Sequence, residues 1–364
     1  MLVIDIKFIL LALAAFVLSS VISFAATPLV KRLAHKVGAV DVPNDERRMH
    51  KVPTPRMGGL AIFLAFLFSV LLFVDITVQL RGILIGAVVI VVLGIVDDIV
   101  PLPALFKFAV QIVAAYIVVA HGTVISTFTN PNVFSASPFI DLGNWGIPVT
   151  IFWIVAITNA VNLIDGLDGL AVGVSSISAF SLLLIAIVLP EYNIALLMAA
   201  LAGACIGFMP YNLSPAKIFM GDTGSTFLGF LLACVSIQGL FKFYAIVSFA
   251  VPFLIVGLPL FDTIFTFSRR IMKGQNPMKA DRLHVHHRLV DMGFSQKETV
   301  TILYIMSGLL GLAAVVLATT GEFRFLLLIL AFCLAFILGG KAYIESKKSK
   351  EEAEKKKAEE KSEE

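Results

Sequence analysis

Four groups of acidic, amide and histidine side chains stand out in an otherwise apolar sequence. They are Asp97-Asp98, the run from Asn159 to Asp168 (NAVNLIDGLD), Gly221-Asp222 and His284-Val285-His286-His287. Carboxylate and amide oxygens are the ligands that hard cations such as Mg²⁺ prefer, and His⁺ and Arg side chains make strong hydrogen bonds to phosphate. The residue types together therefore predict a metal-dependent active site that handles phosphate groups.

The pair Asp97-Asp98 directly follows the apolar run VVIVVLGIV. A carboxylate at bilayer depth costs about 2.5–3.5 kcal/mol, and neighbouring helical residues point about 100° apart. We therefore expect one aspartate to act as a base or ligand and the other to anchor a Lys or Arg. Lys107, within LFKFAVQIVAAY, needs an anionic partner, and Asp98 or a substrate phosphate would serve. The alternatives are two interfacial acids that cap a helix end and a lysine that snorkels to the interface.

The second group ends one predicted helix and begins another. Asn159 and Asn162 are three residues apart and share a helical face that Asp165 continues. Gly166 and Gly169 allow the backbone to break there and to approach a ligand closely. Oxygen donors in this spacing suit Mg²⁺. The alternative is a helix–turn–helix with packing asparagines and capping aspartates.

Asp222 stands just before a long apolar span, in FMGDTGS. It could be the N-cap of the helix, with Ser225 at the third helical position. A carboxylate at that point could equally hold a metal, with the helix N-terminal amides facing phosphate. Because the other polar groups are expected on the same face, we favour metal ligation.

Two basic segments complete the candidate site. The loop at 268–297 contains the three histidines between Arg282 and Arg288. Zinc binding is the alternative for these histidines, but the loop has no Cys and the other clusters suit harder metals. We therefore predict that the histidines and arginines bind phosphate. The segment 41–59 contains Lys51 and Arg56 among prolines and ends in Gly-Gly; it is either a shaped phosphate or lipid contact or an ordinary loop at an anionic membrane surface.

The elements that must position these residues are membrane helices. The chain has 364 residues, of which 59% are hydrophobic, and its mean hydropathy is +0.95. Apolar runs of about 20 residues match the thickness of a bilayer core, and their continuity excludes a β-barrel. The net charge of +3 gives no reason to expect a nucleic-acid partner. The three cysteines lie in apolar spans and are expected to be buried: Cys205, Cys234 and Cys333.

The fold class is therefore predicted as all-α, a polytopic integral membrane protein with 10 or 11 transmembrane helices. The eleven expected spans lie at 5–30, 58–75, 80–96, 102–121, 149–165, 168–190, 194–211, 224–240, 243–267, 298–318 and 323–343. Residues 1–344 form the integral membrane domain, and residues 345–364 form a charged low-complexity tail. The segment 122–148 reads as a connector that could contain a short hairpin.

The distribution of Lys and Arg predicts the orientation. The segments 31–57 and 268–297, the tail from Lys341, and Lys107 and Lys217 together contain 24 of the 28 basic residues. The positive-inside rule then places the N-terminus outside and the C-terminus in the cytoplasm. All of the polar clusters fall on the cytoplasmic side in this arrangement, although they were not used to set it.

Five motifs occur in an order typical of one family: HKVPTPRMGG, GIVDD with a lysine nine residues on, NAVNLIDGLDGLA, MGDTGS and HVHHRL. The chain resembles the polyprenyl-phosphate N-acetylhexosamine-1-phosphate transferases, which are related to the phospho-MurNAc-pentapeptide translocase of peptidoglycan synthesis. The resemblance implies a bacterial plasma-membrane enzyme with a cytoplasmic active site. It further implies transfer of a sugar 1-phosphate from a UDP-sugar to polyprenyl (undecaprenyl) phosphate with Mg²⁺, or Mn²⁺ in its place, and release of UMP.

Carried over residue by residue, the resemblance implies that Asp222 is a metal ligand, joined by Asn162 or Asp165. It implies that Asp97 or Asp98 serves the acceptor phosphate, with Asp97 as the base, and that Lys107 binds phosphate. His286 and His287 are expected to be catalytic, with Asp97, Asp98 and Lys107. The residues expected to bind the nucleotide sugar or the acceptor are Lys51, Arg56, Asn159, Arg282, His284 and Arg288.

Arg56 within TPRMGG and the HVHH arrangement are similar to the GlcNAc-1-phosphate branch, so UDP-GlcNAc is the expected donor. The product would initiate a cell-surface glycan such as teichoic acid or O-antigen lipopolysaccharide. A phospho-MurNAc-pentapeptide transferase is the alternative, and an ion-coupled secondary transporter is a remote one, because its carboxylates would lie near the bilayer midplane. The sequence does not decide between a monomer and a homodimer.

Overall fold

The computed structural model describes residues 6–43, 52–129, 139–240, 247–272 and 284–320. Within these ranges the helices are α1 (Ile6–Val37), α2 (Gly59–Phe73), α3 (Val78–Ile99), α4 (Ala104–Ala120), α5 (Gly146–Leu163), α6 (Leu170–Val188), α7 (Tyr192–Asn212), α8 (Gly221–Leu240), α9 (Val247–Ile255), α10 (Gly257–Met272), α11 (Val285–Asp291) and α12 (Gln296–Thr320), with a 3₁₀ turn, η1, at Gly143–Trp145. Two short antiparallel ribbons pair β1 (Val40–Asp41) with β2 (Thr54–Pro55) and β3 (Thr127–Thr129) with β4 (Phe139–Asp141).

The helices confirm the all-α membrane class. Among the described residues, six helical segments are long and apolar enough to cross a bilayer: 6–37, 78–99, 143–163, 170–188, 192–212 and 296–320; α2 and α4 are shorter apolar helices. Large apolar side chains such as Leu10, Phe68, Leu105 and Phe152 are exposed on the outside of the bundle. An apolar exterior of this kind suits contact with lipid, in which the backbone polar groups must be satisfied within each helix.

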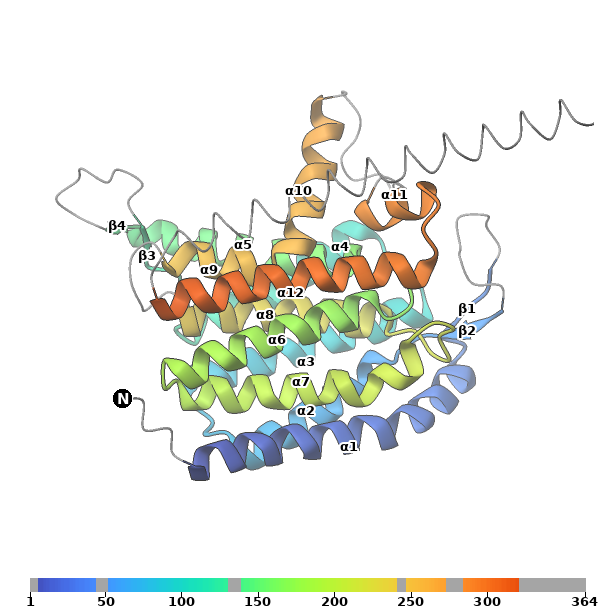
Figure 1. The fold of residues 1–364 in the computed structure, drawn as a ribbon, viewed down its shortest axis with the longest axis horizontal. Helices are drawn as coiled ribbons and strands as arrows, with labels where there is room; N and C mark the ends of the chain where they lie inside the picture. The colour runs from blue at the N-terminus through green and yellow to red at the C-terminus, as the bar shows by residue number, and fades with distance from the viewer. Residues whose placement is uncertain (1–5, 44–51, 130–138, 241–246, 273–283, 321–364) are drawn as a thin grey trace, which may run out of the picture.

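Helix α8 is the centre of the bundle, in contact with α2, α3, α5 and α6 (Figure 1). Its side chains are buried on all sides; Phe227, Leu228, Phe230 and Leu231 are fully buried. A helix that is apolar all round belongs in a core, which explains why this segment shows no polar face. Asp222, in its first turn, is thereby placed at the end of the most enclosed helix.

The two ribbons lie at opposite ends of the bundle (Figure 1). The β1–β2 ribbon and α11 lie at the end where α1 finishes, and the β3–β4 ribbon lies at the end where α1 begins. The hairpin that the sequence allowed within 122–148 is present, with Phe128 opposite Ile140.

Two predicted spans differ from the structure. The expected span 243–267 is two helices, α9 and α10, which meet at Val256, and α10 rises steeply out of the bundle (Figure 1). Pro259 has no N–H for the carbonyl of Ile255, and the loss of this hydrogen bond favours a break in the helix there. Helix α1 continues to Val37, beyond its predicted end at residue 30. The span predicted at 323–343 and the tail at 345–364 lie outside the described residues.

Candidate active site

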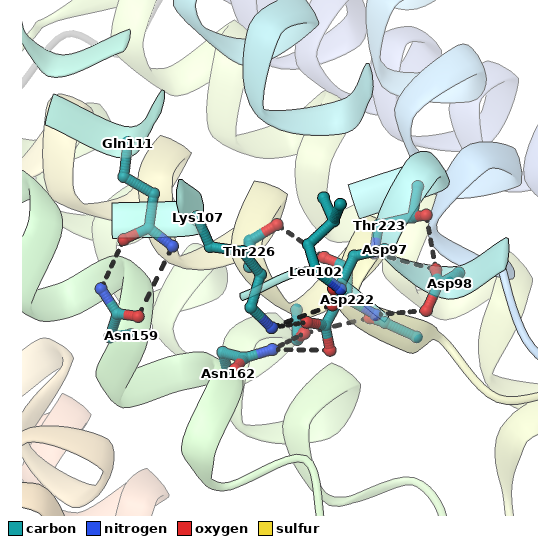
Figure 2. A network of polar contacts seen from close by, with 12 residues as sticks. Asp97, Asp98, Leu102, Lys107, Gln111, Asn159, Asn162, Asp222, Thr223 and Thr226 are labelled. Atoms are coloured by element: carbon teal, nitrogen blue, oxygen red, sulfur yellow. Dashed lines mark hydrogen bonds and ion pairs between the residues drawn. The ribbon is translucent and has the colours of Figure 1, made fainter. Parts of the chain in front are cut away.

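Two carboxylates share the ammonium group of Lys107 at one end of the bundle (Figure 2). Lys107 Nζ lies 2.9 Å from Asp97 Oδ2 and 2.9 Å from Asp222 Oδ2. Asp97 is near the end of α3, Lys107 is in the first turn of α4 and Asp222 is in the first turn of α8. Of the two partners that the sequence left open for Lys107, Asp98 is wrong, because its neighbour Asp97 binds the lysine; the substrate phosphate stays a prediction.

A proline-rich turn returns the chain from Asp97 to Lys107. Residues 101–103, Pro-Leu-Pro, separate α3 from α4, and the Leu102 amide donates to Asp97 Oδ1 at 2.7 Å. The carbonyl of Pro103 accepts from the Lys107 amide at 3.2 Å and begins α4. Asp97 thus orders the turn with one oxygen and binds the lysine with the other.

Asn162 is another partner of Asp222. Its Nδ2 donates to Asp222 Oδ1 at 3.1 Å and to Ser225 Oγ at 2.8 Å, which joins the end of α5 to the start of α8. The structure therefore brings together two of the three predicted metal-binding residues, Asn162 and Asp222. Asp165, the third, lies in the α5–α6 turn, within electrostatic reach of Asp222, Asp98 and Arg56.

Asp98 caps α8 from another helix. Its Oδ1 accepts from the Asp222 amide at 2.9 Å, and its Oδ2 accepts from the Thr223 amide at 3.1 Å and from Thr223 Oγ1 at 2.6 Å. Gly221 has φ +70°, and a Cβ at this position would collide with the Asp98 carboxylate. The idea that Asp222 is itself the N-cap is therefore wrong, and the first amides of α8 face Asp98 rather than a phosphate.

The exposure of these side chains separates two roles. Lys107 and Asp222 keep 28% and 27% of their side-chain surface exposed, and Asp97 keeps 10%. Asp98 is buried, with both oxygens hydrogen-bonded. Lys107, Asp222 and Asp97 can therefore meet a substrate, whereas the geometry favours a positioning role for Asp98 over its predicted catalytic role.

Asn159 lies one turn before Asn162 on α5 but faces a different partner. Its Nδ2 donates to Gln111 Oε1 at 2.6 Å (Figure 2) and to the Val155 carbonyl at 2.8 Å. Gln111 is buried and lies one turn after Lys107 on α4. The sequence reasoning missed Gln111, although a glutamine four residues after a lysine in an apolar helix is a visible signal. The substrate contact predicted for Asn159 stays a prediction.

Arg56 lies beside the chain that leads into Asp222. It forms an ion pair of 3.1 Å with Asp41. The segment containing Arg56 runs along residues 219–220, where the Phe219 amide donates to the Pro55 carbonyl at 2.8 Å and the Gly59 amide donates to the Met220 carbonyl at 2.9 Å. This segment is thus part of the wall of the site. Lys51, predicted with it, lies outside the described residues.

The histidine motif packs against the α5–α6 turn. A Cβ at Gly166 would collide with His286 Nε2, so His286 lies directly on the glycine that follows Asp165. His286 is buried, and burial, followed by the nearby His287, lowers its pKa to about 3. The prediction of a cationic surface is therefore wrong for His286, which is neutral at pH 7.

The residues that follow His286 are less enclosed than it is. The His287 ring lies 4.3 Å from that of His286, and the exposed Arg288 lies over the Phe265 ring at 5.8 Å. Arg282 lies outside the described residues. His284 is buried, and Asp262 on α10 binds it. Asp262 was missed, although a lone acid inside a predicted span is a functional candidate.

The donor set fits a hard cation bound together with substrate. Within the described ranges, no three His, Cys, Asp or Glu side chains form a metal-binding group by themselves. Mg²⁺ is usually held by one or two carboxylates, waters and substrate phosphates. Asp97 and Asp222 already share one positive charge, that of Lys107, and the Asn162 amide is an additional oxygen source.

The free cysteines Cys205 and Cys234 are buried within α7 and α8, as expected.

The matches to known proteins fit this geometry. The profile of glycosyl transferase family 4 matches residues 80–240. The probable undecaprenyl-phosphate N-acetylglucosaminyl 1-phosphate transferase of Bacillus subtilis (strain 168) is 40% identical over 326 residues, which cover 89% of this chain and 90% of that relative. The chain belongs to the polyprenyl-phosphate sugar-1-phosphate transferases.

Two further members of this transferase family show its range. The decaprenyl-phosphate N-acetylglucosaminephosphotransferase of Mycobacterium tuberculosis (strain ATCC 25618 / H37Rv) is 35% identical, covering 81% of this chain and 80% of the relative. The phospho-N-acetylmuramoyl-pentapeptide-transferase of Staphylococcus aureus (strain MW2) is 32% identical, covering 83% and 97%. The family resemblance drawn from the five motifs is confirmed. The matched range 80–240 runs from α3 to α8 and contains the network of Figure 2.

Proposed function

We propose that this transferase moves GlcNAc-1-phosphate from UDP-GlcNAc to undecaprenyl phosphate, giving undecaprenyl-diphosphate-GlcNAc and UMP. The observation that supports it is the Asp97–Lys107–Asp222 cluster at one end of a membrane bundle. A lipid acceptor whose phosphate lies at the membrane surface can meet a water-soluble donor only at such an end. The product would begin a surface glycan such as teichoic acid or O-antigen.

The reaction exchanges one phosphorus–oxygen bond for another. An oxygen of the lipid phosphate attacks the β-phosphorus of UDP-GlcNAc in line with the bridging oxygen. The bond from the β-phosphorus to that bridging oxygen breaks, and UMP leaves with it. Negative charge grows on the phosphoryl oxygens, so positively charged groups fixed in place before the reaction lower its barrier.

Lys107 is the cation best placed to meet that charge. Its ammonium group is held by two carboxylates but remains partly exposed, so a phosphate oxygen can replace one of them. Asp97 is the candidate base for the lipid phosphate. A phosphate monoester with a second pKa near 6 is already mostly dianionic at pH 7, so Asp97 contributes chiefly by holding Lys107 and the 101–103 turn.

Asp222, Asn162 and Asp97 would hold Mg²⁺, with Asp165 beside them, and Mn²⁺ is a chemically equivalent occupant. When bound, the ion neutralises charge on the phosphate oxygens of the two substrates. The residues themselves supply its oxygen donors and fix their spacing, since α3, α5 and α8 are joined by Asp98, Asn162 and Asp222.

UDP-GlcNAc is favoured over UDP-MurNAc-pentapeptide. Two of the relatives with the higher identities, 40% and 35%, are named for N-acetylglucosamine transfer, and the muramoyl-pentapeptide relative is 32% identical. We assign donor binding to Arg56 and the histidines. Arg56 is held by Asp41 and lies within electrostatic reach of Asp165, which sets it beside the site.

The membrane placement follows from charge. We propose a multi-pass bacterial plasma-membrane protein of eleven spans, with the N-terminus outside and the C-terminus in the cytoplasm. The end of the bundle that contains the cluster is also the end with β1–β2 and α11, and the basic segments 31–57 and 268–297 flank these elements. The active site then faces the cytoplasm.

Purified protein with radiolabelled UDP-GlcNAc, undecaprenyl phosphate and Mg²⁺ tests the proposal. The expected result is label that extracts with lipid, together with an equal amount of UMP. The matched control is the Asp97→Asn variant, in which turnover should fall by orders of magnitude. Lipid label from UDP-MurNAc-pentapeptide but not from UDP-GlcNAc would move the protein to the peptidoglycan branch, and no product from either would reject the assignment.

A further inference from the structure

Asp262 is a buried carboxylate in a helix that is otherwise apolar near it. It is the only acidic residue of α10, and 3% of its surface is exposed. Its Oδ2 lies 2.9 Å from His284 Nδ1, and its Oδ1 accepts from the Val285 amide at 2.8 Å. Both oxygens of Asp262 therefore bind the beginning of the histidine motif, which lies more than twenty residues further along the chain.

These two bonds determine the state of the His284 ring. An ionised carboxylate only accepts hydrogen bonds, so the proton of a neutral His284 must be on Nδ1. The other ring nitrogen, Nε2, is on the far side of the ring from Nδ1 and is not engaged by Asp262. When a partner fixes one nitrogen of an imidazole, it fixes both the tautomer and the orientation of the ring.

The ring of His284 is the first of a contiguous series. It lies parallel to the His286 ring, with centroids 5.8 Å apart and planes 7° apart, and His286 in turn contacts His287 at 4.3 Å. His286 Nε2 rests against Gly166, in the turn that contains Asp165. Asp262 thus holds, through His284, the contact between the histidine motif and the turn that completes the active site.

We propose that Asp262 positions the nucleotide sugar by acting through His284. This inference rests on the proposed transfer from a UDP-sugar. His284 immediately precedes the short helix α11, which lies at the end of the bundle that also contains the β1–β2 ribbon (Figure 1). A donor that arrives from water reaches this end, whereas the isoprenoid chain of the acceptor lies in lipid. Asp262 presents His284 Nε2 to the donor and keeps His286 on the α5–α6 turn. Its loss should weaken use of the donor and leave use of the lipid acceptor intact.

The Asp262→Asn variant tests this with little change in volume. Its single carbonyl oxygen can accept from His284 Nδ1 or from Val285, but not from both, and the amide group favours the wrong tautomer of His284. We expect kcat/KM for UDP-GlcNAc to fall about 10- to 100-fold, as when an orienting carboxylate is removed from a functional imidazole. The KM for undecaprenyl phosphate should stay within twofold. Calorimetric binding of UDP-GlcNAc without acceptor should weaken as well.

A double-variant cycle separates positioning from a merely structural role. If Asp262 acts through His284, the Asp262→Asn change should lower kcat/KM in the wild-type chain but have little further effect in a His284→Ala background. Thr266→Val, one turn along on the same helix, is the matched control, since Thr266 Oγ1 is buried without a hydrogen-bond partner among the described residues. It should behave as wild type.

Three results would overturn the inference. They are an unchanged kcat/KM for UDP-GlcNAc in Asp262→Asn, an equal loss with and without His284, or parallel losses for donor and acceptor that follow a lower unfolding temperature. If wild-type protein uses a different UDP-sugar, the proposed donor is wrong. The same cycle is then measured with the sugar that is used, so the two failures remain distinct.

Discussion

Replacing Asp98 by Asn should destabilise the fold much more than the same change at its neighbour Asp97. Asp98 accepts three hydrogen bonds from the first turn of α8. An asparagine can keep the two at Thr223 by placing its carbonyl oxygen there. Its NH₂ group then faces the Asp222 amide, donor against donor, at a buried position.

The magnitude follows from these contacts. One charge-assisted hydrogen bond is lost, which costs about 1.5–3 kcal/mol when the remaining donor is buried. The negative charge at the N-terminus of α8 is also lost, which costs about 0.3–1 kcal/mol. The expected fall in the free energy of unfolding is therefore about 2–4 kcal/mol.

The Asp97→Asn variant is the matched comparison. Its carbonyl oxygen can keep the bond to Leu102, and Lys107 retains Asp222. Because the ion pair is partly exposed, its loss should cost about 1 kcal/mol or less. Turnover per folded molecule should fall by orders of magnitude in this variant, whereas in Asp98→Asn most of the loss should follow the folded fraction.

A thiol-reactive fluorophore can report unfolding in detergent, since Cys205 and Cys234 are free and buried. Cys333, which lies outside the described residues, is replaced by Ser in every variant so that only buried thiols report. Asp98→Asn should unfold several degrees Celsius below Asp97→Asn. Equal unfolding temperatures, together with complete loss of turnover in Asp98→Asn, would refute the capping argument and return Asp98 to the chemistry.

Three other expectations concern the same network. Gly221→Ala should lose at least about 2 kcal/mol of stability, because it adds a clash with Asp98 to about 1–2 kcal/mol of backbone strain; Gly293→Ala, with φ +96° and open space, should show the strain alone, and equal losses would contradict this. Lys107→Met leaves two carboxylates without their shared cation, so turnover should fall at least about 100-fold. MgCl₂ should also raise the unfolding temperature of this variant more than it raises that of the wild type. Equal shifts of the unfolding temperature in the two proteins would disprove this expectation. Chelation by EDTA should abolish turnover, Mg²⁺ or Mn²⁺ should restore it, and Asp222→Asn should need more Mg²⁺; an EDTA-resistant enzyme would exclude the metal.

The sequence was informative wherever the signal was local. Continuous apolar runs predict helices, and most ends fall within a few residues of the predicted ones, since lipid demands internally satisfied backbone. Pro259 is a local signal for the break between α9 and α10. The continuous high hydropathy of 243–267 nevertheless predicted a single span. Charged groups next to apolar runs indicated Asp97, Lys107 and Asp222 because burying them without partners is costly.

Sequence could not assign partners across helices. Asp97 and Asp98 are adjacent, with the same chemistry, and only the rotation of α3 against α4 and α8 decides that the first binds Lys107 and the second caps α8. Asp262 and Gln111 had local signals, but their partners, His284 and Asn159, come from other parts of the chain. The neutral state of His286 depends on burial by a turn more than a hundred residues away.

By itself, then, the sequence determined the class of fold, the residue types of the site, the family and the chemistry that those residues can support. These follow from composition, periodicity and ordered motifs, which are properties of short stretches of chain. Only the tertiary structure decided which oxygen meets which donor, because hydrogen bonds and ion pairs act over about 3 Å. A small rotation of a helix exchanges one partner for another at that distance, and no pattern in the sequence reports such a rotation.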